Sequence, residues 1–271
     1  MMDTTTNTPH DTWATRFESV GLDELDATAS LQTRVDRKYV ATCADLEAVM
    51  DRVAGHGRVL DLDGRRQFSY RSTYYDTPDR SSYLDTARKR PRRWKARTRT
   101  YLDSDVHFIE VKTRSRRKRT VKTRQSASAR DHDHLSAASR RFVATTLSER
   151  LDITLDAARQ IVDELQPTLT TEYQRATLLV PSDASRATVD TGFTVSLPDG
   201  TSRRFGDQVI IETKTSGRAS LVDRSLWDMG IRPVSISKFG AGLAILEPSL
   251  PAAKWNRVLR HNFDWTPARA A

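Results

Sequence analysis

The sequence predicts an α+β fold in which antiparallel strands form a closed antiparallel β-barrel with helices packed outside. Three observations lead to this class. Strand-like segments come in groups, helical segments are inserted between these groups, and several strands carry charged residues on one face and apolar residues on the other. A closed barrel leaves no strand edge unpaired, and a charged inner face suits a wet lumen.

The N-terminal part of the chain predicts one helix and one strand. Apolar residues recur with helical spacing over residues 46–53, and the Gly55–Gly57 segment ends that helix. Residues 66–76 are aromatic and β-branched, which is typical of a strand, and Pro78 follows as a turn. A short helical turn is expected near Tyr83.

A hairpin of basic strands is expected next. Residues 93–101 and 106–113 alternate in character, and Asp103-Ser104-Asp105 separates them. Because side chains of a strand alternate between its two faces, one face of this hairpin collects most of the charge. We expect that face to hold Lys95, Arg97, Arg99 and Tyr101, then Val106, Phe108, Glu110 and Lys112, and, from a third strand at 118–124, Lys118, Thr120, Lys122 and Arg124.

The second half of the chain mixes helices and strands. Residues 135–165 predict two helices, the second capped by Thr154 and ended by Pro167. Strands are expected at 168–180, 186–197, 208–215 and 234–238, with a turn at Pro198-Asp199-Gly200 and a helix from about Leu221 that stops at Gly230.

The domain organisation is expected to be simple. We expect a disordered tail at 1–16, one domain over 17–262 and a C-terminal tail at 263–271. The chain has no run of the roughly 20 apolar residues that a membrane span needs and no apolar signal segment, so a cytoplasmic location is expected. The single cysteine, Cys43, excludes an internal disulfide and a Cys-rich zinc site.

Positive charge is concentrated in two short runs. The net charge is +9, and residues 88–99 and 112–124 together hold 16 of the 44 Lys and Arg residues. Such density favours a polyanionic partner. Nucleic acid is one candidate, since Trp94 and Tyr101 lie among the basic residues, although no zinc finger, RNA-recognition signature or helix-turn-helix is found. A solvated charged face is the simpler interpretation for Arg116–Arg119.

Seven short motifs occur in a fixed order along the chain. They are Arg37-Lys38-Tyr39, Tyr74-Tyr75-Asp76-Thr77, Lys95-x-Arg97-x-Arg99, Glu110-Val111-Lys112-Thr113-Arg114, QPxxxxEYxR at 166–175, Glu212-Thr213-Lys214 and Ser237-Lys238-Phe239. In this order the sequence, from about Thr33 to Leu246, resembles the VTC (vacuolar transporter chaperone) domain of the triphosphate tunnel metalloenzyme superfamily, which is also described as CYTH-like.

The resemblance implies a polyphosphate polymerase that transfers the γ-phosphate of ATP to a growing polyphosphate chain inside a barrel-shaped tunnel. The cofactor implied is Mn²⁺ or Mg²⁺, and the partners are ATP, inorganic polyphosphate and possible membrane subunits that would supply an anchor. The resemblance assigns catalysis to Lys38, Arg97, Arg99, Lys214 and Lys238, phosphate binding to Lys95, Lys112, Lys122, Arg124 and Arg175, and metal binding to Glu212. Tyr39, Tyr74 and Tyr75 are interpreted as structural.

One departure within the superfamily favours the polymerase branch. Members that hydrolyse triphosphates or cyclise ATP carry Glu-x-Glu-x-Lys on the first strand, where this sequence has Arg34-x-Asp36-x-Lys38. A tunnel triphosphatase, a polyphosphate sensor without turnover and a nucleic-acid-binding protein remain as alternatives. Glu110 and Glu212 could also serve only as salt-bridge partners of nearby lysines, and His132 and His134 are expected in a surface loop.

Overall fold

The computed structural model describes residues 9–28, 35–114 and 120–267, and these form two compact units. The first unit comprises residues 1–68, 173–193 and 205–234, and the second comprises 69–172, 194–204 and 235–271, each without the undescribed positions. The sequence predicted a single domain, and that expectation stays a prediction.

One large sheet contains all the strands of the described chain. Its main order is β2-β11-β9-β8-β4-β5-β6-β7; β10 pairs with β9, β3 with β8, and β1 with β3 in parallel. The strands are β1 (Glu18–Val20), β2 (Val35–Thr42), β3 (Arg58–Leu60), β4 (Phe68–Asp76), β5 (Arg93–Tyr101), β6 (Val106–Arg114), β7 (Thr120–Ser126), β8 (Gln166–Val180), β9 (Ser185–Ser196), β10 (Ser202–Phe205) and β11 (Gln208–Thr215).

The α+β class is confirmed, because helices are inserted between groups of antiparallel strands. Within the described ranges the strand order starts at β2 and ends at β7 without returning to β2. The closed barrel is therefore not confirmed. Short pairings at β1, β3 and β10 were not foreseen, since segments of three or four residues carry too little alternation to be recognised.

In the first unit, helices cover one face of the strands. The helix α2 (Cys43–Val53) starts with a capping box between Thr42 and Asp45, and its apolar stripe packs with α6 (Leu221–Asp228) into one core. Tyr39, Val189 and Ile211 supply strand residues to this core. The 3₁₀ helix η1 (Pro9–Arg16) joins it through the fully buried Trp13, so the fold begins before residue 17, contrary to the expected tail at 1–16. A further helix, α1 (Leu22–Thr28), follows β1.

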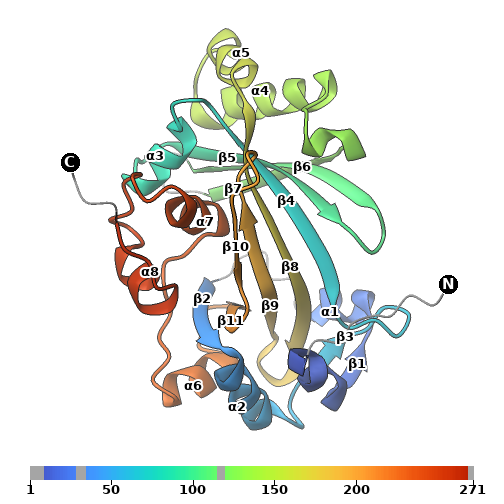
Figure 1. Cartoon of the computed structure of the whole chain (residues 1–271). Helices are drawn as coiled ribbons and strands as arrows, with labels where there is room; N and C mark the ends of the chain where they lie inside the picture. The colour runs from blue at the N-terminus through green and yellow to red at the C-terminus, as the bar shows by residue number, and fades with distance from the viewer. Residues whose placement is uncertain (1–8, 29–34, 115–119, 268–271) are drawn as a thin grey trace, which may run out of the picture. The chain divides into compact units, whose positions relative to one another are not determined.

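In the second unit, α4 (Ala137–Leu151) packs over β5 and β6, and α5 (Leu155–Asp163) packs against α4, in the upper part of Figure 1. The shared core contains Trp94, Ala96, Ile109 and Val111 from the apolar face of these strands. The two helices and the Thr154 cap are as predicted. The opposite face of β5 and β6 is therefore the charged one.

The C-terminal part of the second unit corrects one prediction. The strand expected at 234–238 is wrong: residues 231–237 have no regular structure, and Lys238 opens the helix α7 (Lys238–Leu246) behind an N-cap at Ser237. The run Phe239-Gly-Ala-Gly-Leu-Ala-Ile is buried on every side, so it lacks a helical polar stripe. Gly240 is required because a Cβ there would lie 2.2 Å from the Trp255 ring.

The remaining helices belong to the second unit, apart from η3. They are α3 (Ser81–Ala87), the 3₁₀ helices η2 (Ala129–His132) and η3 (Pro181–Asp183, in the first unit), and α8 (Asn256–Asn262). Phe263 and Trp265 are buried, at 2% and 4% exposure, so the fold continues into the segment expected to be a tail. Among the described residues, no helix combines the length and the apolar character needed to cross a membrane.

Candidate functional site

The charged face of β5, β6 and β7 forms the first group of candidate residues. We call Arg97, Arg99, Glu110, Lys122 and Arg124 the Arg97 cluster. Cross-strand register places Arg97 opposite Glu110 and Glu110 opposite Arg124, so the faces predicted from period two are confirmed. Lys118 lies outside the described residues.

Glu110 is the centre of this cluster. Its Oε2 accepts hydrogen bonds from Arg97 Nε at 2.8 Å and Nη2 at 2.6 Å, Arg99 Nε lies 4.0 Å away, and Lys122 contacts Oε1. Burial alone would raise the pKa of Glu110, but the charges of Arg97, Arg99 and Lys122 outweigh it and hold the pKa well below the usual range. A permanent anion therefore fixes three cations, and Glu110 forms salt bridges with Arg97 and Arg99 as well as with a lysine, Lys122.

Aromatic rings fix the arginines further. Arg97 Nη1 donates to Tyr74 Oη at 2.9 Å, and Tyr74 is stacked on Phe239 with centroids 5.0 Å apart. The guanidinium of Arg124 lies 4.8 Å from the Phe108 ring centroid. Tyr74 was interpreted as structural only; its position on β4 opposite Arg97 shows that it also orients a candidate residue, which alternation on residues 68–76 could have indicated.

Lys95 and Lys112 continue the same face toward the other end of the strands, where they lie opposite each other. Lys95 Nζ donates to Ser237 Oγ at 3.0 Å, and Ser237 Oγ accepts from the Gly240 amide that it caps. Lys238, the first residue of α7, is half-buried. The first turn of that helix adds backbone N–H groups that attract anions.

The first unit holds the second group, which we call the Lys38 cluster: Lys38, Arg175, Glu212 and Lys214. Lys38 Nζ lies 2.5 Å from Glu212 Oε1, and the two residues are directly paired across β2 and β11. Arg175 makes a bidentate contact with Asp190, at 2.6 and 2.8 Å. Lys214 lies two residues along β11 from Glu212, on the same face.

In the Lys38 cluster, burial and the charge of the ion-pair partner shift each pKa in opposite directions. Burial would raise the pKa of Glu212, but Lys38 and Lys214 lower it to about 2, so the carboxylate is ionised at neutral pH. Burial lowers the pKa of Lys214 to about 8, although Glu212 raises it. A pKa of about 8 means that the lysine loses its charge in mildly alkaline solution, and a bound anion would favour the charged form.

The other face of β2 carries a structural network that sequence reasoning missed. Asp223 accepts hydrogen bonds from Tyr39 Oη and Thr213 Oγ1, both at 2.6 Å, and pairs with Arg37 at 3.3 Å. Asp223 also caps α6 through Ser220. Tyr39 is therefore structural, as predicted, and the network anchors the strand that carries Lys38.

The described residues set limits on a metal site. They contain no group of three or more His, Cys, Asp or Glu side chains that could together hold an ion. His132 and His134 make only local contacts around η2, with Asp133 and with backbone carbonyls. Magnesium commonly binds through one or two carboxylates plus substrate phosphates, so Glu212 fits an ion that arrives with a phosphate substrate.

The eleven predicted site residues thus fall into two groups. The second unit holds Lys95, Arg97, Arg99, Lys112, Lys122, Arg124 and Lys238, and the first unit holds Lys38, Arg175, Glu212 and Lys214. Both groups place fixed cations around a buried or half-buried carboxylate. Arg34, part of the motif that separates the branches, lies outside the described residues.

A family model described as the VTC domain matches residues 33–247. The chain belongs to the VTC domain family. No curated protein matches the chain. Among solved structures, this VTC domain is similar to a putative adenylyl cyclase, HpAC1 from Hippeastrum, for which a dominant triphosphatase activity is described, with 13% identity, a TM-score of 0.52 and coverage of 82% of this chain and 100% of the other.

Two bacterial structures are also similar to this VTC domain, and both are described as putative adenylate cyclases. The protein from Bacillus halodurans has 15% identity, a TM-score of 0.44, and coverage of 75% of this chain and 93% of the other. The protein from Vibrio parahaemolyticus has 14% identity, a TM-score of 0.39, and coverage of 75% and 94%. At these identities the likeness to HpAC1 concerns the fold alone.

Proposed function

We propose that this VTC domain is a polyphosphate polymerase that transfers the γ-phosphate of ATP to a growing inorganic polyphosphate chain. The observation that carries the proposal is the Arg97 cluster: in a chain of the VTC domain family, one strand face gathers four cations around a single buried carboxylate. The proposal includes closure of the sheet into a tunnel whose inner surface carries these cations.

For this reaction the protein must position the two phosphate substrates and stabilise the charge that develops on the transferred group. In phosphoryl transfer, charge spreads over the oxygens of the transferred group, and fixed cations stabilise it without reorganising. Arg97 is already held by Glu110 and Tyr74, so its fork of donors is oriented before substrate binds. The acceptor is itself an anionic phosphate oxygen, so no side-chain nucleophile is needed.

Each cluster has a role in this proposal. In the second unit, phosphates are bound by the four cations of the Arg97 cluster, which are Arg97, Arg99, Lys122 and Arg124. In the first unit, phosphates are bound by the cations of the Lys38 cluster, which are Lys38, Lys214 and Arg175. Glu212 would hold Mg²⁺ or Mn²⁺, which would neutralise negative charge on the triphosphate. Lys38 keeps Glu212 ionised and oriented for that role.

The experiment is incubation of the purified full chain with ATP and Mn²⁺, followed by separation of nucleotides from polyphosphate. ADP together with long polyphosphate is expected, and Glu212→Gln should lose both products because a neutral amide binds a divalent cation poorly. Arg159→Gln, which removes an exposed charge on α5, is the control and should keep full activity.

Other product patterns would point elsewhere. Orthophosphate released from tripolyphosphate without chain growth would instead identify a triphosphatase, the activity described for the Hippeastrum protein. Tight polyphosphate binding without any product would identify a sensor.

A further inference from the structure

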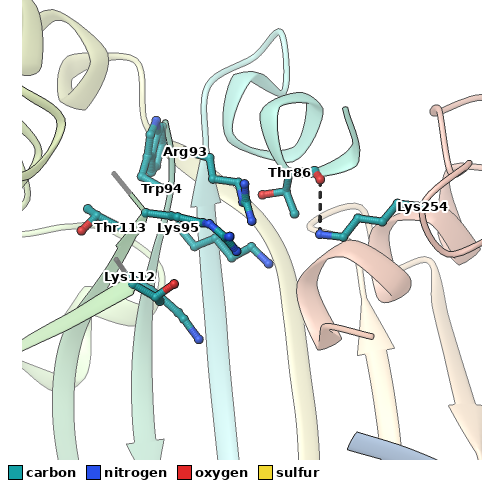
Figure 2. Close-up of a pocket in the computed structure, with 9 residues that line it drawn as sticks. Thr86, Arg93, Trp94, Lys95, Lys112, Thr113 and Lys254 are labelled. Carbon is teal, nitrogen blue, oxygen red and sulfur yellow. Dashed lines mark hydrogen bonds between the residues drawn. The ribbon is translucent and has the colours of Figure 1, made fainter. Parts of the chain in front are cut away.

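A basic pocket lies at one end of the hairpin, beyond the Arg97 cluster. We call it the Arg93 pocket after five cations that line it: Arg93, Lys95, Lys112, Arg114 and Lys254. It has a volume of about 190 Å³, and no Asp or Glu is among the described residues that line it. In Figure 2, Arg93 and Lys95 extend from β5 toward the space that Lys254 faces from another segment.

Like charges face each other directly in this pocket. Register pairs Arg93 with Arg114 and Lys95 with Lys112 across β5 and β6. Like charges directly opposite one another destabilise a strand pair, so two consecutive pairs are a cost to the fold. The Arg97 cluster offsets its charge with Glu110, whereas none of the described residues that line the pocket is a carboxylate; Asp85, outside the lining, acts electrostatically on Arg93.

Three of these cations donate hydrogen bonds to neutral oxygens. Arg93 donates to the Arg90 carbonyl at 2.6 Å, Lys95 to Ser237 Oγ at 3.0 Å and Lys254 to the Thr86 carbonyl at 3.4 Å. Burial, together with the charges of Arg93, Lys89 and Arg114, lowers the pKa of Lys254 to about 8. Burial and then the charge of Lys254 lower the pKa of Lys95 as well. A multiply charged anion would relieve this repulsion.

The position of Lys254 is fixed by its neighbour. Trp255 is 1% exposed and packs over Gly240 of α7, where any larger residue would collide with the ring. Lys254 also lies after residue 247, where the match to the VTC domain ends. The pocket is therefore completed by a part of the chain outside the matched domain.

The pocket is continuous with the Arg97 cluster. Lys95 and Arg97 are successive residues on one face of β5, about 7 Å apart at strand spacing. A flexible chain of phosphates held by Arg97 could extend into the pocket without a break in positive charge. A ligand as short as a triphosphate, once bound at the Arg97 cluster, would have few phosphates left to enter the pocket.

We propose that the Arg93 pocket binds phosphates of a polyphosphate chain that lie beyond those held by the Arg97 cluster, and so makes the protein prefer long polyphosphate to tripolyphosphate. This proposal rests on the proposed function, because it takes the same anion to occupy both places. It assigns Arg93, Arg114 and Lys254 to chain-length selection and not to phosphoryl transfer.

The test is the affinity of the full chain for long-chain polyphosphate and for tripolyphosphate, measured by calorimetry without metal or ATP. Lys254→Gln and Arg93→Gln are each expected to weaken long-chain binding about tenfold, the usual cost of one charge-assisted contact, and to leave tripolyphosphate binding unchanged. Lys254→Arg should retain long-chain affinity. Arg159→Gln is the matched loss of an exposed charge and should change neither affinity.

Two results would overturn the proposal. One is an equal loss of both affinities in the Lys254 and Arg93 variants, which would make the pocket part of the triphosphate site. The other is no loss of long-chain binding, in variants whose thermal unfolding matches the wild type. Arg97→Gln separates the two proposals: if it leaves both affinities intact, the Arg97 cluster is not the phosphate site, whatever the pocket variants do.

Discussion

At the scale of single residues, Glu110 shows how a buried charge can serve a basic site. An isolated carboxylate would be costly at 2% exposure, but three cations compensate it. Since buried ion pairs add little net stability, its main effect is to hold Arg97 and Lys122 at set positions. The cations still outnumber it, so the face keeps an excess of positive charge for a ligand.

Glu110→Gln should therefore destabilise the free protein and increase its response to anions. We expect a loss of about 2 kcal/mol in the free energy of unfolding, below the full cost of breaking a buried pair because Lys122 is 45% exposed. Tripolyphosphate should raise the thermal unfolding midpoint more in the variant than in the wild type, since the anion then replaces the missing charge.

The control is Glu172→Gln, which breaks the exposed pair with Arg71 and should have little effect. An unfolding midpoint equal to that of the wild type in Glu110→Gln would show that Glu110 does not compensate these cations.

The lowered pKa of Lys214 predicts that anion binding depends on pH. Its pKa is lowered to about 8, so it loses its charge as pH rises through that value, and an anion loses a partner. Tripolyphosphate affinity should fall above pH 8, by at most about tenfold per pH unit for this one proton. The wild type is compared with Lys214→Arg, which stays charged and should show a shallower fall. Identical pH profiles in calorimetric titrations would remove Lys214 from the site.

At the scale of elements, alternation in sequence was enough to find the basic face but not its partners. Lys95, Arg97 and Arg99 repeat every second residue, so their common face followed from strand geometry alone. The role of Glu110 depends on its register against Arg97 and Arg124, which no local pattern specifies. Lys254 was not found at all, because it reaches the pocket through the packing of Trp255.

The start of α7 was misread for a related reason. A strand was expected from Val234 to Lys238, and Val234 does donate one backbone hydrogen bond to the Lys38 carbonyl, at 2.7 Å. The segment forms no strand, because Ser237 caps a helix whose residues are nearly all buried. Helical periodicity is invisible when every face of a helix is apolar.

The Ser237 cap links this helix to the basic face, so Ser237→Ala should affect both stability and binding. Loss of the N-cap is expected to cost about 1 kcal/mol in urea unfolding, and loss of the Lys95 contact should weaken polyphosphate binding a few-fold. Ser237→Thr keeps a hydroxyl and should behave like the wild type. A stability loss without any change in affinity would make Ser237 a helix cap only.

At the scale of the whole molecule, the net charge of +9 would suit nucleic acid as well as polyphosphate. Proteins that bind single strands without sequence preference add aromatic rings on which bases stack. Here Trp94 is 4% exposed within the core under α4, and the Tyr101 ring packs against Tyr70 and Phe108. The aromatic residues that suggested nucleic acid are thus occupied with protein packing, which favours a ligand that is only a chain of phosphates.

A competition experiment decides between these two polyanions. We expect long-chain polyphosphate to displace single-stranded DNA of equal total charge, with an affinity at least about tenfold higher, because the DNA gains no base stacking and must bring bulky sugars to the cation face. Fluorescently labelled oligothymidylate bound at low salt provides the signal. Tyr101→Leu should not weaken DNA binding, since its ring is not free to stack. Equal affinities, or DNA binding that depends on Tyr101, would return nucleic acid to the leading place and remove the basis for a polyphosphate site.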